Sequence, residues 1–312
     1  MTIHPPESRS TAAMTSPGQP AGLPANHQRT GRGPLRAWIE EHDLWAYALV
    51  AYGVSWTLLV GGYFGTRAGL LDVDGVPVAL MIQVAAAGPL IAALVVISFR
   101  RGRPGLASFG RSLVRWRIAP WWYGFAFLGV PLIMVAAMWA LHPAEISTAL
   151  AENWTRVLIQ FPLVVLAVAL LTGLAEEPGW RGYAQPVANR RYRPLMAALT
   201  VSVMWALWHL PNALFGQSLT ETLLHLLATV VNGFVLAWAY NATGGSVLIV
   251  MLLHGAQNAT AGLVQGLLQD APQAFTASEY YLVSAFMFGT LMLLVAALTR
   301  GRLGLPAVAI EV

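Results

Sequence analysis

The sequence predicts an all-α membrane protein of about eight transmembrane helices, with both termini in the cytoplasm. Hydrophobic residues make up 57% of the chain and charged residues only 10%, whereas soluble domains carry roughly 25% charged residues. The apolar residues fall into blocks of about 17 to 25, the length that a helix needs to cross ~30 Å of hydrocarbon. The basic residues gather on one side of the helices that these blocks predict, as cytoplasmic loops do.

The apolar blocks, taken in chain order, define a transmembrane domain over residues 37–303. Residues 1–36 are rich in Pro, Gly, Ser and Thr and lack the apolar core of a signal peptide. They predict a disordered cytoplasmic tail, and residues 304–312 predict a short second tail. The predicted spans are 44–64, 78–99, 119–141, 157–176, 195–212, 222–240, 246–268 and 281–299.

Every basic residue is an arginine, and only Arg67 and Arg156 fall in loops on the side opposite to the others. The pI of 9.7 therefore reflects membrane topology rather than a nucleic-acid surface. The chain has no cysteine, which excludes disulfides, thiolate metal sites and a cysteine nucleophile. No internal repeat is evident, which disfavours the inverted-repeat transporters. The composition indicates a multi-pass protein of a cell membrane, and the exclusive use of arginine favours a bacterial plasma membrane.

Ionisable residues inside a predicted span are functional-site candidates, because their burial in lipid costs free energy. The first cluster ends the fourth span, where Glu176 and Glu177 precede Pro178 and Arg181. The four-residue spacing places Glu177 and Arg181 on one helical face, so that the guanidinium can neutralise one carboxylate and leave Glu176 for proton transfer. Pro178 is expected to kink this helix or to start a new one.

Two further clusters lie in the fifth and seventh spans. Trp205 and His209 share a helical face, and so do His254 and Asn258. Each of these residues alone can equally be a hydrogen-bonding contact between helices. Three clusters on three spans are better explained as one site. His225, Asn232 and His142 lack such companions, so we assign them structural roles outside the site.

The three motifs, taken in order, resemble the CPBP family, which comprises the type II CAAX prenyl endopeptidases and their bacterial relatives. The resemblance covers about residues 150–260. Residues 88–93 and the arginine-rich loop after them are also similar to the segment that precedes this core in the family. One departure is Trp205, where the family more often has phenylalanine. The family implies an intramembrane endopeptidase, open to the cytoplasm, that acts on membrane-associated or lipid-modified, CAAX-like proteins or peptides.

By this resemblance, Glu176 and His209 activate water, and His254 and Asn258 stabilise the oxyanion. Glu177, Arg181 and Trp205 then support the arrangement. The family has also been classed with metalloproteases, and Glu176, His209 and His254 can provide a zinc shell of three protein ligands. The sequence has no His-Glu-x-x-His motif and Asn258 suits an oxyanion donor, so we favour a metal-free glutamate mechanism over a zinc enzyme.

The predicted spans place Glu176 at the inner face and His209 ~21 Å deep, too far apart to touch. We therefore expect the fourth helix to continue toward Tyr183 and the fifth to begin later than hydropathy indicates. Two non-proteolytic alternatives remain, a proton-coupled transporter and a membrane immunity factor against bacteriocin-like peptides. The sequence specifies neither the natural substrate nor its prenylation.

Overall fold

The computed structural model describes residues 33–267 and 276–306, and every regular element in those ranges is a helix. Seven helical stretches there are long and apolar enough to cross a membrane, and one bent helix pair can form an eighth span. The prediction of an all-helical membrane bundle is confirmed. Most of the predicted N-terminal tail and residues 307–312 lie outside the described residues. The first helix begins at Pro34, three residues inside the predicted tail.

The N-terminal part contains α1 (Pro34–Glu41), α2 (Asp43–Arg67), α3 (Val76–Ala86) and α4 (Gly88–Leu113). The second predicted span is the pair α3 and α4, which bends by 50° between its members. Helix α4 is itself broken at Gly102, whose φ of 55° and ψ of −151° lie outside the helical region. Pro104 follows two residues later, where a proline is tolerated because the preceding helix has already ended.

The third span contains α5 (Trp121–Gly124), η1 (Phe125–Gly129) and α6 (Val130–Leu141), and α7 (Pro143–Glu152) follows it. The fourth span is a single helical stretch from Arg156 to Asn189, interrupted only by wider π-helical turns. Its segments are η2 (Arg156–Gln160), α8 (Phe161–Val168), η3 (Ala169–Gly173), α9 (Leu174–Glu177), η4 (Pro178–Ala184) and α10 (Gln185–Asn189). The helix thus continues past Glu176, and Pro178 falls in a π-helical turn rather than at a helix end.

The remaining elements are α11 (Pro194–Trp208), the 3₁₀ helix η5 (Leu210–Phe215), α12 (Leu219–Ala242), α13 (Val247–Leu267) and α14 (Ala277–Leu298). The expectation that the fifth span begins late is wrong, because α11 begins at Pro194. Glu176 lies thirteen residues before the end of its stretch, or ~20 Å. His209 lies fifteen residues after the start of α11, or ~22 Å. The two residues reach similar depths because both helices extend from the same end.

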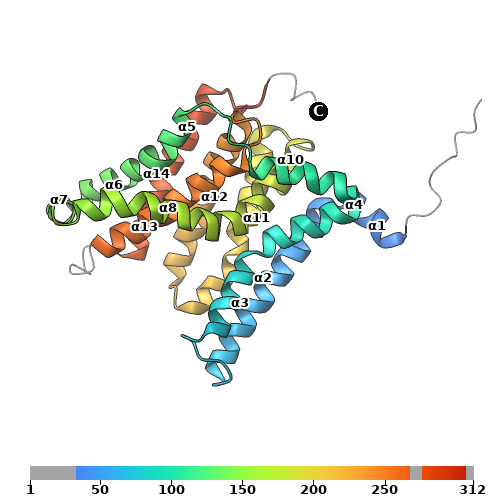
Figure 1. Ribbon diagram of the computed structural model, residues 1–312, viewed down its shortest axis with the longest axis horizontal. Coiled ribbons are helices and arrows are strands. Elements are labelled where there is room, and N and C mark those ends of the chain that lie inside the picture. The colour runs from blue at the N-terminus through green and yellow to red at the C-terminus, as the bar shows by residue number, and fades with distance from the viewer. Residues whose placement is uncertain (1–32, 268–275, 307–312) are drawn as a thin grey trace, which may run out of the picture.

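Helix α13 lies at the centre of the bundle, with 72% of its apolar stretch buried inside the protein. Figure 1 shows α6, α8 and α13 running side by side, and α2, α3 and α4 grouped in another part of the molecule. A Cβ on Gly255 would lie 2.7 Å from the backbone nitrogen of Ala169, and one on Gly173 would lie 2.9 Å from the Met251 carbonyl oxygen. Glycines at these two positions let the fourth span approach α13 closely.

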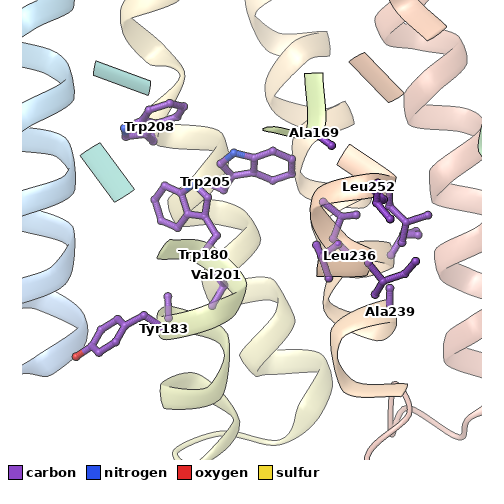
Figure 2. Close-up of a cluster of buried hydrophobic side chains, with 14 of the residues drawn as sticks. Ala169, Trp180, Tyr183, Val201, Trp205, Trp208, Leu236, Ala239 and Leu252 are labelled. Carbon is purple, nitrogen blue, oxygen red and sulfur yellow. The ribbon is translucent and has the colours of Figure 1, made fainter. Parts of the chain in front are cut away.

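Aromatic residues fill the space beside this central helix. Figure 2 shows the indole rings of the fourth and fifth spans gathered together, with smaller aliphatic side chains of α12 and α13 across from them. Trp180 and Trp205 are buried, and both lie within a turn or two of the polar candidates. The apolar packing therefore holds the polar residues of α9, η4 and α11 in fixed positions.

Candidate active site

A buried ion cluster lies where α9, η4 and α13 meet, formed by Glu177, Arg181 and His254. Nη1 of Arg181 donates to Oε1 and Oε2 of Glu177, each at 2.9 Å. Nδ1 of His254 lies 2.7 Å from Oε1 of the same carboxylate. The side chains of Glu177 and Arg181 have no solvent exposure. A buried carboxylate of this kind is tolerated only when it is paired, and here both of its oxygens have partners.

Glu176 faces the other way from its neighbour and meets α11. Its Oε2 accepts a hydrogen bond of 2.8 Å from the indole Nε1 of Trp205. The guanidinium carbon of Arg181 lies 4.4 Å from the centre of the Trp205 ring, in cation–π geometry. Trp205 therefore links Glu176 to the ion cluster. Its indole donates a hydrogen bond to Glu176, and its ring contacts Arg181, the ion-pair partner of Glu177. Among the residues that the structure describes, the second oxygen of Glu176 has no hydrogen-bond partner, and the side chain lines a cavity.

His209 is oriented by the end of its own helix. Its Nδ1 lies 2.9 Å from the carbonyl oxygen of Trp205, and α11 ends at Trp208. A carbonyl oxygen only accepts hydrogen bonds, so Nδ1 carries a proton, and in the neutral ring Nε2 keeps its lone pair. His209 thus presents an acceptor, suited to receive a proton or to hold a water molecule.

These residues border a cavity of about 230 Å³ inside the bundle. Glu176, His209, His254 and Asn258 all line it, together with Trp205, whereas Glu177 and Arg181 lie behind its wall. The structure thus brings together the four residues for which the sequence predicts catalytic roles. The complete lining is Glu176, Trp205, His209, Asn212, His225, Ala228, Thr229, Asn232, His254, Gln257, Asn258, Tyr280, Tyr281, Ser284 and Phe288.

Two residues to which the sequence analysis gave structural roles also line this cavity. The ring of His225 lies 4.8 Å from that of His209 and stacks on Tyr281 at 4.6 Å. Asn232 exchanges two amide hydrogen bonds with Gln257, of 2.5 and 2.6 Å. The seven-residue spacing of His225 and Asn232 places both on one face of α12, a signal that could have assigned them to the site. The other outlying histidine, His142, pairs with Glu279 at 3.6 Å.

A groove begins on the other side of Asn258, between α13 and the start of the fourth span. It has a volume of about 420 Å³, and Asn258 lines both this groove and the cavity. Gly262 and Gly266 form part of its floor, and a Cβ on either would meet nothing within 4 Å. The other lining residues are mostly apolar, with Arg156 and Gln160 among them. The candidate site therefore adjoins a mostly apolar groove on the surface of α13.

The three side chains proposed as zinc ligands do not converge as a metal site. Within the two described ranges, no group of three His, Asp or Glu side chains lies close enough to hold a metal ion. Nδ1 of His254 is bound to Glu177 and Nδ1 of His209 to a carbonyl oxygen, so each offers only Nε2. Hydrogen bonding at Nδ1 is common to zinc-binding and catalytic histidines, so only the spacing of the three side chains disfavours a zinc centre.

Comparison with known proteins identifies the segment that carries this geometry. Residues 158–260 match the family model described as type II CAAX prenyl endopeptidase Rce1-like. The chain is also similar to CAAX prenyl protease 2 of Methanococcus maripaludis, at 29% identity over 99 residues. The match covers 29% of this chain and 36% of the relative, so the chain spans about a third of the curated protein that it matches. The matched segment includes every candidate residue from Glu176 to Asn258, and it is similar to the Rce1-like type II CAAX prenyl endopeptidases.

Proposed function

We propose that this protein is an intramembrane endopeptidase that hydrolyses a peptide bond of a membrane-associated protein or peptide, using water activated by Glu176. The observation that carries the proposal is the shared cavity, in which one free carboxylate oxygen, two histidines and an amide from three spans face the same space. The match of residues 158–260 to the type II CAAX prenyl endopeptidase Rce1-like model supports the same reaction class.

Glu176 is the proposed general base. Its free oxygen accepts a proton from a water molecule while the water oxygen attacks the carbonyl carbon of the scissile amide. The lone pair on Nε2 of His209 accepts a hydrogen bond from the second O–H of this water and so orients it, and that hydrogen stays on the attacking oxygen. When the carbon–nitrogen bond breaks, protonated Glu176 returns its proton to the leaving amine, and the base is regenerated.

His254 and Asn258 are the proposed donors to the oxyanion. Because Nδ1 of His254 donates to Glu177, Nε2 can donate as well only when the ring is the imidazolium cation. The adjacent Glu177 carboxylate stabilises that cation. With Glu176 and Glu177 ionised, the two positive charges of Arg181 and His254 balance the two negative ones, which suits a site with little solvent.

We propose that this hydrolysis needs no metal. The chain itself provides a base for water and two donors for the developing negative charge, the two requirements of amide hydrolysis. The purified protein is expected to keep its activity after prolonged treatment with a zinc chelator and dialysis. Loss of activity under chelation, with recovery on adding Zn²⁺, would favour the metal mechanism instead.

The proposed substrate carries an apolar group next to the scissile bond. The groove that meets the cavity at Asn258 is largely apolar, and a hydrocarbon chain or apolar helix gains free energy by lying in it. The substitution Gly262→Leu fills open space in the groove. It is expected to raise KM for lipid-modified peptides and to leave kcat for a short unmodified peptide unchanged.

The deciding experiment assays the purified protein in detergent against a panel of lipid-modified and unmodified peptides. Glu176→Gln, His209→Ala and His254→Ala are each expected to abolish cleavage while the protein still inserts and folds. Glu145→Gln removes an exposed carboxylate in α7, far along the chain from the cavity residues, and is the control expected to keep full activity. Undiminished cleavage by all three variants would overturn the proposal. Wild-type protein that protects cells or moves protons without cleaving any peptide would favour the non-proteolytic alternatives.

A further inference from the structure

A second cavity, of about 190 Å³, lies at the arginine-rich end of the bundle, away from the candidate active site. It lies between the broken helix α4 and the end of the fourth span. The break at Gly102 gives it two walls from one helix, with Arg100 and Arg101 before the break and Ser108 and Ser112 after it. Arg190, the residue directly after α10, also lines the cavity.

The cavity is lined by more positively charged side chains than there are carboxylates nearby to pair with them. Asp43 is the buried carboxylate nearby, and it pairs with Arg100 and with Arg191, the latter at 2.6 Å. Across the part of the chain that the structure describes, Arg101 and Arg190 make no side-chain hydrogen bond or ion pair. Desolvation and the charge of Arg101 lower the pKa of Arg190. Two guanidinium groups therefore lie close together without a carboxylate of their own.

Hydroxyl groups complete the lining. Ser108 and Ser112 stand four residues apart on one helical face, but the Ser112 hydroxyl already donates to the Phe109 carbonyl oxygen at 2.6 Å. Tyr183 is buried, and its hydroxyl lies beside Arg100 without a well-formed hydrogen bond. Figure 2 shows its ring pointing away from the apolar cluster that surrounds Trp180. The cavity thus combines the guanidinium groups of Arg101 and Arg190 with the hydroxyls of Ser108 and Tyr183, a donor set that binds phosphate oxygens.

We propose that this cavity binds a phosphate group, with the headgroup of an anionic phospholipid as its source. Basic pockets between transmembrane helices on the cytoplasmic side are suited to such headgroups, and the predicted topology puts this end of the bundle there. Exposed apolar residues Phe99, Val114 and Trp116 lie in and just after the same broken helix. They provide a surface for acyl chains next to a site for the charged group.

The test measures binding of two probes to the full-length protein in detergent. Short-chain phosphatidylglycerol is titrated and compared with phosphatidylcholine, and inorganic phosphate is titrated separately, with bound species counted by native mass spectrometry. The variants are R101Q and the double variant R101Q/R190Q. Arg111 is an exposed arginine of the same helix that does not line the cavity, so R111Q is the matched control for charge alone.

The wild-type protein and R111Q are expected to retain phosphatidylglycerol, and R101Q/R190Q to bind it roughly tenfold more weakly, because charge-assisted hydrogen bonds are lost. R101Q alone should show an intermediate loss. Weakening of inorganic phosphate binding without any lipid effect would identify free phosphate as the source of the same group. Equal binding of both probes by wild type and the double variant would overturn the proposal. Peptide cleavage measured in parallel separates this result from any failure of the proposed function.

Discussion

The ion cluster and the cavity wall contain neighbouring glutamates in opposite situations. In the ion cluster, both oxygens of Glu177 are bound and the side chain is completely buried. In the cavity wall, Glu176 lines the cavity, and its one hydrogen bond within residues 33–267 and 276–306 is to the Trp205 indole. A one-residue step along the helix turns the second side chain by about 100°. Glu177 is therefore held within the ion cluster, whereas the preceding Glu176 is the proposed base.

This contrast indicates that the number of hydrogen bonds that a carboxylate already makes distinguishes a positioning residue from a candidate catalytic residue. A carboxylate with every partner in place has no free atom for a substrate or water. A partly satisfied carboxylate in a confined polar space is costly to keep, so its retention favours a functional role. Substitutions confined to the ion cluster or to the cavity wall therefore test whether the two regions act independently.

The largest expected effect comes from Glu176→Gln. Loss of a general base lowers rates by about 10²- to 10⁴-fold, so peptide cleavage should fall below detection. The amide still accepts the Trp205 hydrogen bond, and the thermal unfolding temperature should change little. Cleavage assays and thermal unfolding in the same detergent test both parts. A variant that unfolds early would show that Glu176 is structural, like its neighbour.

Arg181→Met should affect stability more than any substitution in the cavity wall. It leaves the Glu177 carboxylate buried with only His254 as a partner, and removing one member of a buried pair costs about 3–5 kcal/mol. The midpoint of thermal unfolding should drop markedly. The double variant Glu177→Gln/Arg181→Met removes both charges and should recover part of that loss. No recovery would mean that packing of the guanidinium on Trp205, rather than charge pairing, stabilises the cluster.

Trp205→Phe tests the link between the two regions. The ring contact with Arg181 remains, but the hydrogen bond to Glu176 is lost, and a bond to a charged group is worth about 1.5–3 kcal/mol. We expect kcat/KM to fall roughly tenfold or more. Trp208→Phe is the matched control, because the Trp208 indole nitrogen is buried without a hydrogen-bond partner. An equal loss in both variants would attribute the effect to packing.

The smallest effect is expected from His225→Phe. The aromatic ring keeps its stacking on Tyr281, and the imidazole is assigned no proton transfer in the proposed mechanism. Activity should stay within about tenfold of wild type, because loss of a proton-transferring group costs about a hundredfold or more. A loss as large as that of His209→Ala would move His225 from the cavity lining into the catalytic machinery.

The predicted spans agree well with the observed helices wherever apolar residues face lipid. The main difference is in the fourth span, where hydropathy places the end at 176. The expected continuation toward Tyr183 is confirmed, and the structure extends the helix to Asn189. Hydropathy counts Glu177 and Arg181 as costly, but each cancels the charge of the other inside the bundle. The spacing of these residues predicted their pairing, yet the contribution of His254 comes from a helix seventy-seven residues away. The sequence therefore identified the candidate residues, whereas their roles stay predictions.

The helical membrane fold can be predicted from the amino-acid sequence alone. A chain this apolar must satisfy its backbone hydrogen bonds within helices when it enters lipid. The sequence also determined the pairs that share a helical face, because those depend only on residue spacing. Tertiary structure alone decided that α12 and α14 complete the cavity, that α4 breaks beside an arginine-lined pocket and that Glu176 and His209 lie at one depth. These features depend on which helices meet, and the free energy of a buried polar group is set by its partners rather than by its own transfer cost.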